Sequence, residues 1–171
     1  DAQITVINST VNTVLQGLYV LEACRLRDMG LEYQQIVDAL LPIRETGRIF
    51  FTIGSIDYLK HGGRIGKLAG IAASALKIKP VMGSTDEGAI CQLDQARGMN
   101  KALVKMAQNI VDKTKDSENK ILAISHCNCR ERAVLLKNAL EERMPVKHIV
   151  ILDTAGVSSM YANDGGVIVA V

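Results

Sequence analysis

The sequence has few aromatic side chains, and their scarcity argues against one large class of binding sites. Phe, Trp and Tyr make up 4% of the 171 residues, and Trp is absent. Proteins that hold single-stranded nucleic acid stack its bases on aromatic rings, which this chain largely lacks. An excess of one charge is also missing, because 20 Lys and Arg are interspersed with 18 Asp and Glu. Without a basic stripe, we expect no nucleic-acid partner.

Long hydrophobic runs and disulfide spacing are lacking as well. No apolar stretch reaches the roughly 20 residues that cross a bilayer, and no signal peptide is visible. The four cysteines, Cys24, Cys91, Cys127 and Cys129, do not have the spacing of a disulfide framework. Two of them follow His126, but no second ligand pair with zinc spacing accompanies them. We expect reduced thiols, no metal, no cofactor, no integral membrane segment and a cytoplasmic location.

Apolar residues, by contrast, make up 48% of the chain, which is enough for a core, and the length suits one domain, residues 1–171. Short apolar runs predict strands at 4–8, 48–54, 76–82, 121–125, 148–152 and 166–171. Helical periodicity predicts helices at about 14–29, 36–41, 103–110 and 130–143. This alternation predicts an α/β fold in which helices pack on a mixed, mostly buried sheet.

Three local signals refine this expectation. The turn residues of "TDEGA", 85–89, predict a hairpin between the strands that flank them. Pro80 suits an edge strand, because it cannot donate to a ladder. Asn128, with Glu131 three residues later, is typical of a capping box at the start of a helix.

The stretch "YLKHGGRIGKLAG", 58–70, places glycines beside cationic side chains. It is not a phosphate loop, because Leu68 follows Gly66-Lys67 where the Walker pattern needs Ser or Thr. The four-residue spacing of its glycines predicts a buried helix with one thin face. Gly63 predicts a positive φ or a close backbone approach. Arg64 at a helix start opposes the macrodipole, so it calls for Asp57 or a bound anion, and the sequence leaves both open.

Several segments together resemble the DegV family of bacterial fatty-acid-binding proteins. They are "INSTVNTVLQGLYVLEA", "DYLKHGGRIGKLAG", "LKIKPVM", "ARGMNKALVKM", "ISHCNCRERAVLLKNAL" and "VILDTAGVSS". The resemblance implies a second, C-terminal domain that holds the acyl tail in an apolar tunnel. It also implies an upstream α/β domain, with the carboxylate between the two. Because the chain begins without Met, we expect a fragment or processed product that lacks this N-terminal domain.

The resemblance also implies a carrier and not an enzyme. Some family members present their bound long-chain fatty acid to a partner fatty-acid kinase, which phosphorylates the carboxylate. Arg64 is our candidate for the carboxylate, since a guanidinium can bind it in bidentate fashion. Small residues at 69–75 leave room for the tail, with Ile71 among the walls. The expected ligand-binding residues are Gly63, Arg64, Ile65, Leu68, Ile71, Tyr161, Thr13 and His126.

Some of these positions depart from the family pattern. Tyr161 stands where the family has a His, and "NDG", 163–165, replaces a Gly-Pro-Gly turn. Tyr161 can donate a hydrogen bond to a carboxylate but carries no positive charge near neutral pH. Thr13 stands for a family Ser, and Asn8 for an Asp. His126 ends a predicted strand, where α/β sheets often bind ligands, but a capping or surface histidine is the simpler interpretation.

Two other functions remain open at this point. The first is a diverged member with a filled core that serves only in protein interaction, which the altered 161–166 segment favours. The second is an enzyme fragment that resembles part of the dihydroxyacetone kinases, with His126 in its active site. That reading needs a nucleophile, a base and a metal in one cleft, and the sequence offers no convincing set.

Overall fold

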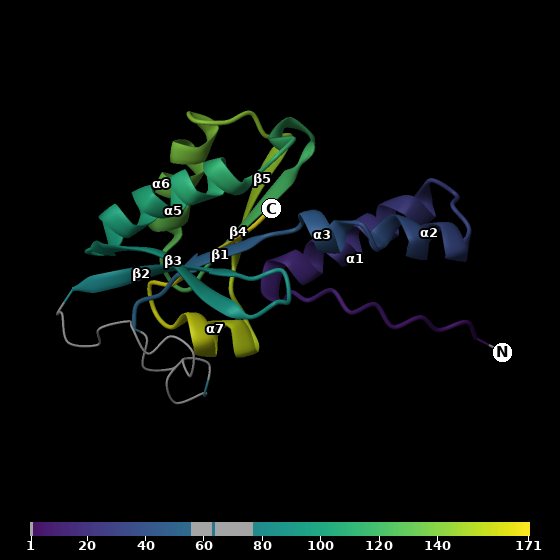
Figure 1. Ribbon diagram of the computed structural model, residues 1–171, viewed down its shortest axis with the longest axis horizontal. Helices are drawn as coiled ribbons and strands as arrows, with labels where there is room; N and C mark the ends of the chain where they lie inside the picture. Colours follow the sequence, from purple (N-terminus) through teal and green to yellow (C-terminus); the bar gives the residue numbers. More distant parts are fainter. Residues whose placement is uncertain (1, 56–62, 64–76) are drawn as a thin grey trace.

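The computed structural model describes residues 2–55, 63 and 77–171 (Figure 1). Its six-stranded sheet has the order β3-β2-β1-β6-β4-β5. Only β4 and β5 pair in parallel among these neighbours, so the sheet is mixed, as predicted. The strands are β1 (Ile49–Thr52), β2 (Ile78–Ser84), β3 (Ile90–Arg97), β4 (Ile121–His126), β5 (His148–Asp153) and β6 (Val167–Ala170).

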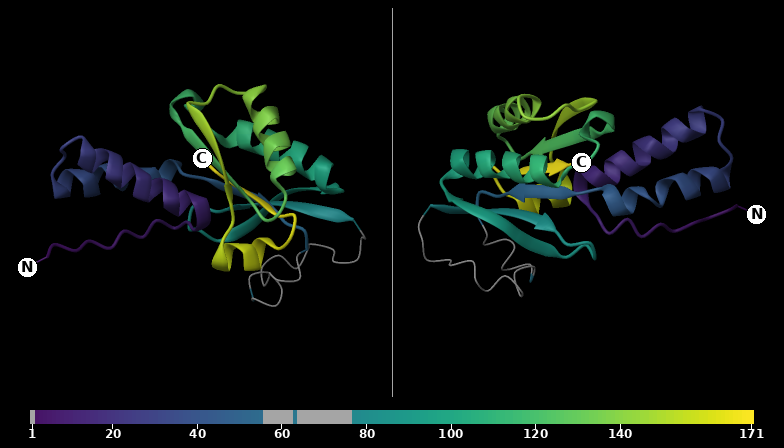
Figure 2. Two further views of the ribbon diagram at one scale, coloured as in Figure 1. Left: turned by 180° about the vertical axis from the view of Figure 1, so that it is seen from behind. Right: turned by 45° about the horizontal axis from the view of Figure 1, so that its top comes forward.

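Helices lie on both faces of this sheet (Figures 1 and 2). The helices are α1 (Thr13–Asp28), α2 (Tyr33–Leu40), α3 (Ile43–Thr46), α5 (Met99–Lys113), α6 (Arg130–Glu141) and α7 (Gly156–Ala162). A short 3-10 turn, Ser117–Asn119, precedes β4. In Figure 1, α5 and α6 lie above the sheet and α7 below it, whereas α1 to α3 extend from one end.

The face under α5 and α6 is the main core, which we call the closed face. Alternate strand residues point to it, because side chains of a strand alternate between faces. The strands contribute Phe50, Val81, Leu122, Ile124, Val167 and Val169. Helix α5 contributes Ala102, Leu103, Met106, Ala107 and Ile110, and α6 contributes Ala133, Leu136 and Leu140. The apolar spacing that predicted the helix at 103–110 is therefore the stripe that α5 buries.

The other face of the central strands is covered differently, and we call it the pocket face. Ile49 and Ile168 pack there against Ala162 of α7, with Phe51 and Val14 partly buried beside them. Helices α1 and α2 pack on each other and against Ala170 of β6, in a small cluster around Leu15, Tyr19, Leu26 and Leu40. Around Ile49 and Ile168 the pocket face has few fully buried side chains, whereas the closed face has many.

Most of the predicted elements are confirmed, including the hairpin. The backbone N–H of Thr85 donates to Ala89 at 2.8 Å and that of Gly88 to Thr85 at 3.0 Å, which closes the turn between β2 and β3. The four cysteines are free thiols. The helix predicted within 58–70 lies outside the described residues. Across the part of the chain that the structure describes, no helix combines the length and apolar character of a membrane span.

Three predictions were wrong. Residues 4–8 form no strand, since Ile4 and Val6 are 84% and 92% exposed and the segment has no strand neighbour in the described sheet. β-branched residues favour an extended backbone, but a strand also needs a partner. Pro80 lies in β2, which is not at an edge. It is tolerated there because β1 pairs only with Met82 and Gly83, leaving Pro80 outside that ladder.

The third wrong prediction concerns the start of α6. Asn128 is not the N-cap; that position belongs to Cys129. Asn128 has a positive φ of 52°, and its Nδ2 donates to the carboxylate of Asp164 at 3.2 Å. The amide is therefore used to bind the 163–166 turn.

Candidate functional site

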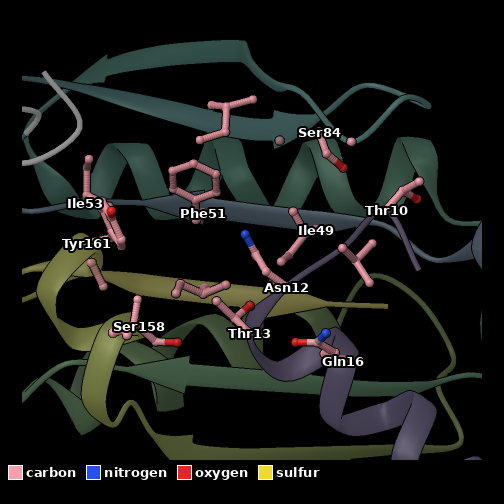
Figure 3. A pocket seen from close by; sticks show the side chains of 17 residues that line it. Thr10, Asn12, Thr13, Gln16, Ile49, Phe51, Ile53, Ser84, Ser158 and Tyr161 are labelled. Atoms are coloured by element: carbon pink, nitrogen blue, oxygen red, sulfur yellow. The ribbon is translucent and has the colours of Figure 1, made fainter. Parts of the chain in front are cut away.

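A pocket of about 440 Å³ opens on the pocket face (Figure 3). This volume is within the usual range for sites that hold small ligands. Its floor is formed by alternate residues of one extended segment, Ile49, Phe51 and Ile53, together with Ile168 of β6. The pocket therefore follows the direction of β1. From residue 49 to residue 53 the chain advances four times by about 3.3 Å, so the floor is roughly 13 Å long.

Three elements form the walls of the pocket. The hairpin contributes residues of β2, β3 and their turn, α7 contributes one side of its short helix, and the start of α1 contributes the remainder (Figure 3). The wall residues are Gly83, Ser84, Gly88 and Ile90; Val157, Ser158, Tyr161 and Ala162; and Thr10, Val11, Asn12, Thr13 and Gln16. No Asp, Glu, Lys, Arg or His is among the described lining residues. The pocket they form is apolar along β1, with neutral polar groups on its walls.

The wall before α1 has an unusual backbone. Thr10 and Thr13 adopt positive φ angles of 56° and 53°, which β-branched residues rarely do. Oγ1 of Thr13 is buried and has no hydrogen-bond partner among the described residues. Asn12, the N-cap of α1, makes no side-chain capping bond. A strained backbone and an unsatisfied hydroxyl therefore occur together at the pocket wall.

Gly88 fixes the distance between this wall and the hairpin. It has a positive φ of 83°, and a Cβ added to it would collide with the carbonyl of Thr10. Only glycine therefore permits both the turn and the close approach of the two walls.

Tyr161 and Ser158 lie toward the other end of the pocket, near Ile53 (Figure 3). Helix α7 carries both, and the hydroxyl groups of Thr154 and Ser159, 2.8 Å apart, share a hydrogen bond at its start. After α7, Asn163 and Gly165 adopt positive φ angles and the N–H of Gly166 donates to Asn163. Residues 163–166 therefore form a tight turn in place of the family's Gly-Pro-Gly, and Asp164 within it does not line the pocket.

The structure brings together two of the residues expected at the site. Thr13 and Tyr161 line the same pocket, from α1 and α7. Gly63 has the predicted positive φ, 69°, with nothing within 4 Å of an added Cβ, and it is not among the pocket-lining residues. Four other expected residues, Arg64, Ile65, Leu68 and Ile71, lie outside the described residues.

His126 lies on the closed face. It shares strand parity with Leu122 and Ile124, which belong to the main core. It is 3% exposed, so it is not a surface histidine. Its Nδ1 accepts the backbone N–H of Cys129 at 3.4 Å, which gives it a capping contact at the start of α6. The sheet therefore separates this ring from the pocket.

The surroundings of His126 offer little for catalysis. The carboxylate of Asp153 lies 3.4 Å from Nδ1 but is 83% exposed. Nε2 is buried without a partner among the described residues. Within the same part of the chain, no group of three His, Cys, Asp or Glu side chains is arranged to hold a metal.

Several lining residues were not anticipated from the sequence. Alternation in "RIFFTIG" could have placed Ile49, Phe51 and Ile53 on one face, since strand residues alternate. Ser158 and Gln16 gave no such signal, because their positions depend on how α7 and α1 meet the sheet.

Comparison with known proteins assigns the chain to a family. The family model described as "Uncharacterised protein, DegV family" matches residues 1–171. The chain belongs to the DegV family. A DegV domain-containing protein of Staphylococcus aureus is 30% identical over 167 residues, which cover 98% of this chain and 60% of the relative. One from Clostridium perfringens is 30% identical over 151 residues, covering 88% and 52%. The chain thus spans between half and two thirds of these relatives.

Solved structures of DegV proteins share this fold. One from Ruminococcus gnavus, refined with vaccenic acid, has a TM-score of 0.94 and 42% identity, and the match covers 100% of this chain and 61% of that one. The fatty acid kinase B3 protein of Streptococcus pneumoniae, loaded with linoleic acid, has a TM-score of 0.89 and 27% identity, covering 98% and 59%. A stearic acid-binding protein from Eubacterium ventriosum has a TM-score of 0.83 and 31% identity, covering 99% and 59%.

Proposed function

We propose that this DegV-family chain binds a long-chain fatty acid whose tail lies in the pocket along β1. The observation that carries the proposal is the apolar floor of Ile49, Phe51, Ile53 and Ile168 in a pocket of about 440 Å³. Each buried CH₂ contributes roughly 0.8 kcal/mol, so a tail along a floor of this length supplies much of the affinity. The fatty acids in related DegV structures support the same class of ligand.

We place the carboxylate at the Tyr161 end of the pocket. Tyr161 has a hydroxyl that can donate to it, and Ser158 lies nearby on the same helix. Arg64 remains our candidate for the charge partner, because a guanidinium binds a carboxylate in bidentate fashion. Ile65, Leu68 and Ile71 complete the proposed ligand contacts from that segment, and Gly63 gives the backbone its positive φ just before Arg64.

We further propose that the chain is a carrier, not a catalyst. The lining of the described pocket supports this, because it contains no Asp, Glu, Lys, Arg or His. In this proposal residues 1–171 are the tail-binding, C-terminal domain of a longer cytoplasmic protein. An N-terminal domain closes the head-group end, and a fatty-acid kinase receives the ligand. The kinase B3 relative supports the last of these steps.

The first test is mass spectrometry of organic extracts from the purified chain, followed by titration with stearic acid. We expect a fatty acid in the extract and saturable binding. Ser158→Trp should fill the pocket and abolish binding, whereas Met160→Trp on the same helix should not, because Met160 is 51% exposed and outside the pocket. Equal binding by both variants would place the lipid elsewhere. No lipid and no titratable binding would favour the interaction-only reading.

Arg64 is tested separately. Arg64→Ala should weaken stearic acid binding and lower any phosphorylation of the bound acid by a fatty-acid kinase. Unchanged behaviour in both assays would remove Arg64 from the site.

A further inference from the structure

The segment before α1, residues 3–8, lies along the α1–α2 pair beyond the end of the sheet (Figures 1 and 2). The hydroxyls of Thr5 and of Tyr33 in α2 are 2.5 Å apart and share a hydrogen bond. Ile7 is partly buried and packs against the apolar cluster between these helices. One face of the segment is therefore held against α1 and α2.

The opposite face of this segment is apolar and uncovered. Side chains of an extended backbone alternate, so Ile4 and Val6 point away from Thr5 and Ile7, and they are 84% and 92% exposed. No backbone-to-backbone hydrogen bond joins residues 3–8 to another described segment. Apolar and β-branched side chains on both faces are typical of an inner strand of an α/β sheet, which helices cover on both sides. The segment has the side chains of such a strand but lacks neighbouring strands.

Helix α1 carries a second apolar stripe on its outer side. The stripe that it buries against α2 and β6 contains Leu15, Tyr19 and Leu26. The outer stripe lies about half a turn further around the helix and consists of Gly17, Val20, Leu21 and Cys24. Val20 and Leu21 are 61% and 65% exposed. A helix that is apolar on two opposite sides is typical of one packed between two layers.

We propose that a second α/β layer, formed by a further part of the same protein, covers both surfaces. Its sheet takes residues 3–8 as an inner strand, and other parts of it cover the outer stripe of α1. This assignment rests on the proposed function, in which the chain is part of a longer protein, and adds the surface by which the rest attaches.

The same polypeptide fits this surface better than a second copy of the chain does. These residues cover 60% of the Staphylococcus aureus relative and 61% of the Ruminococcus gnavus structure, so a protein of that length has the residues for another layer. A second copy would add one strand and leave both outer edges of the pair open, and an isolated pair of strands is marginally stable.

Attachment at this surface connects the second layer to the pocket. The start of α1 lines the pocket wall with Asn12, Thr13 and Gln16. A small domain is roughly 30 Å across, which exceeds the length of the pocket floor. A layer held on α1 can therefore also reach the Tyr161 end, where we place the carboxylate.

Hydrogen exchange with mass spectrometry tests the strand by comparing the 171-residue chain with the natural protein that includes its upstream sequence. In the 171-residue chain the amides of residues 3–8 should exchange at the rate of an unstructured peptide. In the longer protein they should exchange about a thousandfold or more slowly, because opening an inner strand approaches global unfolding. Unprotected amides in the longer protein would overturn the proposal. Protection in the 171-residue chain that rises with its concentration would also overturn it, since a second copy would then be the partner.

Leu21→Gln tests the outer stripe. In the longer protein it should lower the folding equilibrium constant in urea by roughly ten- to hundredfold, the effect of losing one buried Leu side chain, and it should leave the 171-residue chain unchanged. Leu135→Gln on α6 is the matched control, because Leu135 is 56% exposed and lies outside this surface. Equal effects of the two variants on the longer protein would contradict burial of the stripe. Circular dichroism checks that each variant is folded.

Stearic acid titration of both forms keeps this proposal separate from the proposed function. Absence of binding in both forms would overturn the proposed function. The exchange of residues 3–8 and the Leu21→Gln result decide the attachment whether or not lipid binds.

Discussion

Phe50 and Phe51 are neighbours on β1 and lie on opposite faces of the sheet. Phe50 is 1% exposed and packs in the core beneath α5 and α6, whereas Phe51 is partly buried and lines the pocket. The two residues have the same side chain and nearly the same backbone position. The difference between them comes from what covers each face: α5 and α6 on one side, and α7, the start of α1 and the β2–β3 hairpin around an open pocket on the other.

This contrast separates two uses of apolar residues in one sheet. On the closed face, helix side chains fill the space between strands, so the buried area stabilises the fold. On the pocket face the cover is incomplete, and apolar residues such as Ile49 and Ile168 remain available to a ligand. Substitutions on the closed face should therefore change stability, and substitutions on the pocket face should change binding.

The largest expected effect comes from the two phenylalanines. Phe50→Ala should lower the free energy of unfolding by about 3–5 kcal/mol, since it leaves a cavity in a filled core. Phe51→Ala enlarges a space that already exists, so it loses the transfer free energy but little cavity energy and should cost only about 1–3 kcal/mol while weakening stearic acid binding. Urea unfolding and calorimetric titration measure the two quantities. Equal losses of stability would show that both faces are packed alike.

Gly88 tests whether the pocket wall depends on the hairpin. Gly88→Ala should cost about 1–3 kcal/mol, because of its positive φ, and also push the Thr10 carbonyl away. Gly98 is the matched control, since its φ is 86° but nothing lies within 4 Å of an added Cβ. Both variants should lose stability in urea, yet only Gly88→Ala should weaken ligand binding. Weaker binding in both would mean that binding follows global stability.

A substitution at His126 tests whether a change on the closed face affects stability without affecting binding. His126→Ala removes a buried ring and the acceptor of the Cys129 N–H, so we expect a loss of about 1–3 kcal/mol in unfolding free energy. Stearic acid binding should stay unchanged. Tyr161→Phe should show the reverse pattern, with near-native stability and weaker binding. If His126→Ala kept native stability but no longer bound lipid, His126 would belong to the functional site after all.

The sequence was most informative for elements whose own residues show a periodic apolar pattern. Leu103, Met106, Ala107 and Ile110 have the spacing of one helical face, and all four are buried in α5. Helix α7 was missed because seven residues give too few turns for a periodic signal. The segment at 4–8 has the composition of a strand, but pairing depends on a neighbour that composition does not specify.

The candidate site was harder to predict, because a pocket is a property of packing. Thr13 and Tyr161 were found through the family resemblance, and both line the pocket. Parity along β4 could have grouped His126 with Ile124. It could not have revealed which face of the sheet is filled, since that depends on where α5, α6 and α7 lie.

The smallest expected effect belongs to an ion pair that joins β3 to α5. The Lys105 ammonium, 2.7 Å from the Asp94 carboxylate, lowers the pKa of Asp94, with a further contribution from the Gln95 backbone N–H. Because the pKa is lower in the folded state, this stabilisation is full above the unfolded pKa of about 4. It is lost as the pH falls through the folded value.

Both partners of this pair are at least one third exposed, so solvent limits its contribution to about 0.3–1 kcal/mol. Asp94→Asn should therefore reduce stability at pH 7, and the difference from the parent chain should shrink below about pH 4. Asp112→Asn is the control, since Asp112 accepts a hydrogen bond from the uncharged Gln108. Stearic acid binding by Asp94→Asn should be unchanged at pH 7, because the pair lies outside the pocket. If stearic acid binding fell together with stability, a small loss of stability at the edge of the sheet would be enough to change the pocket. The two faces would then not be independent.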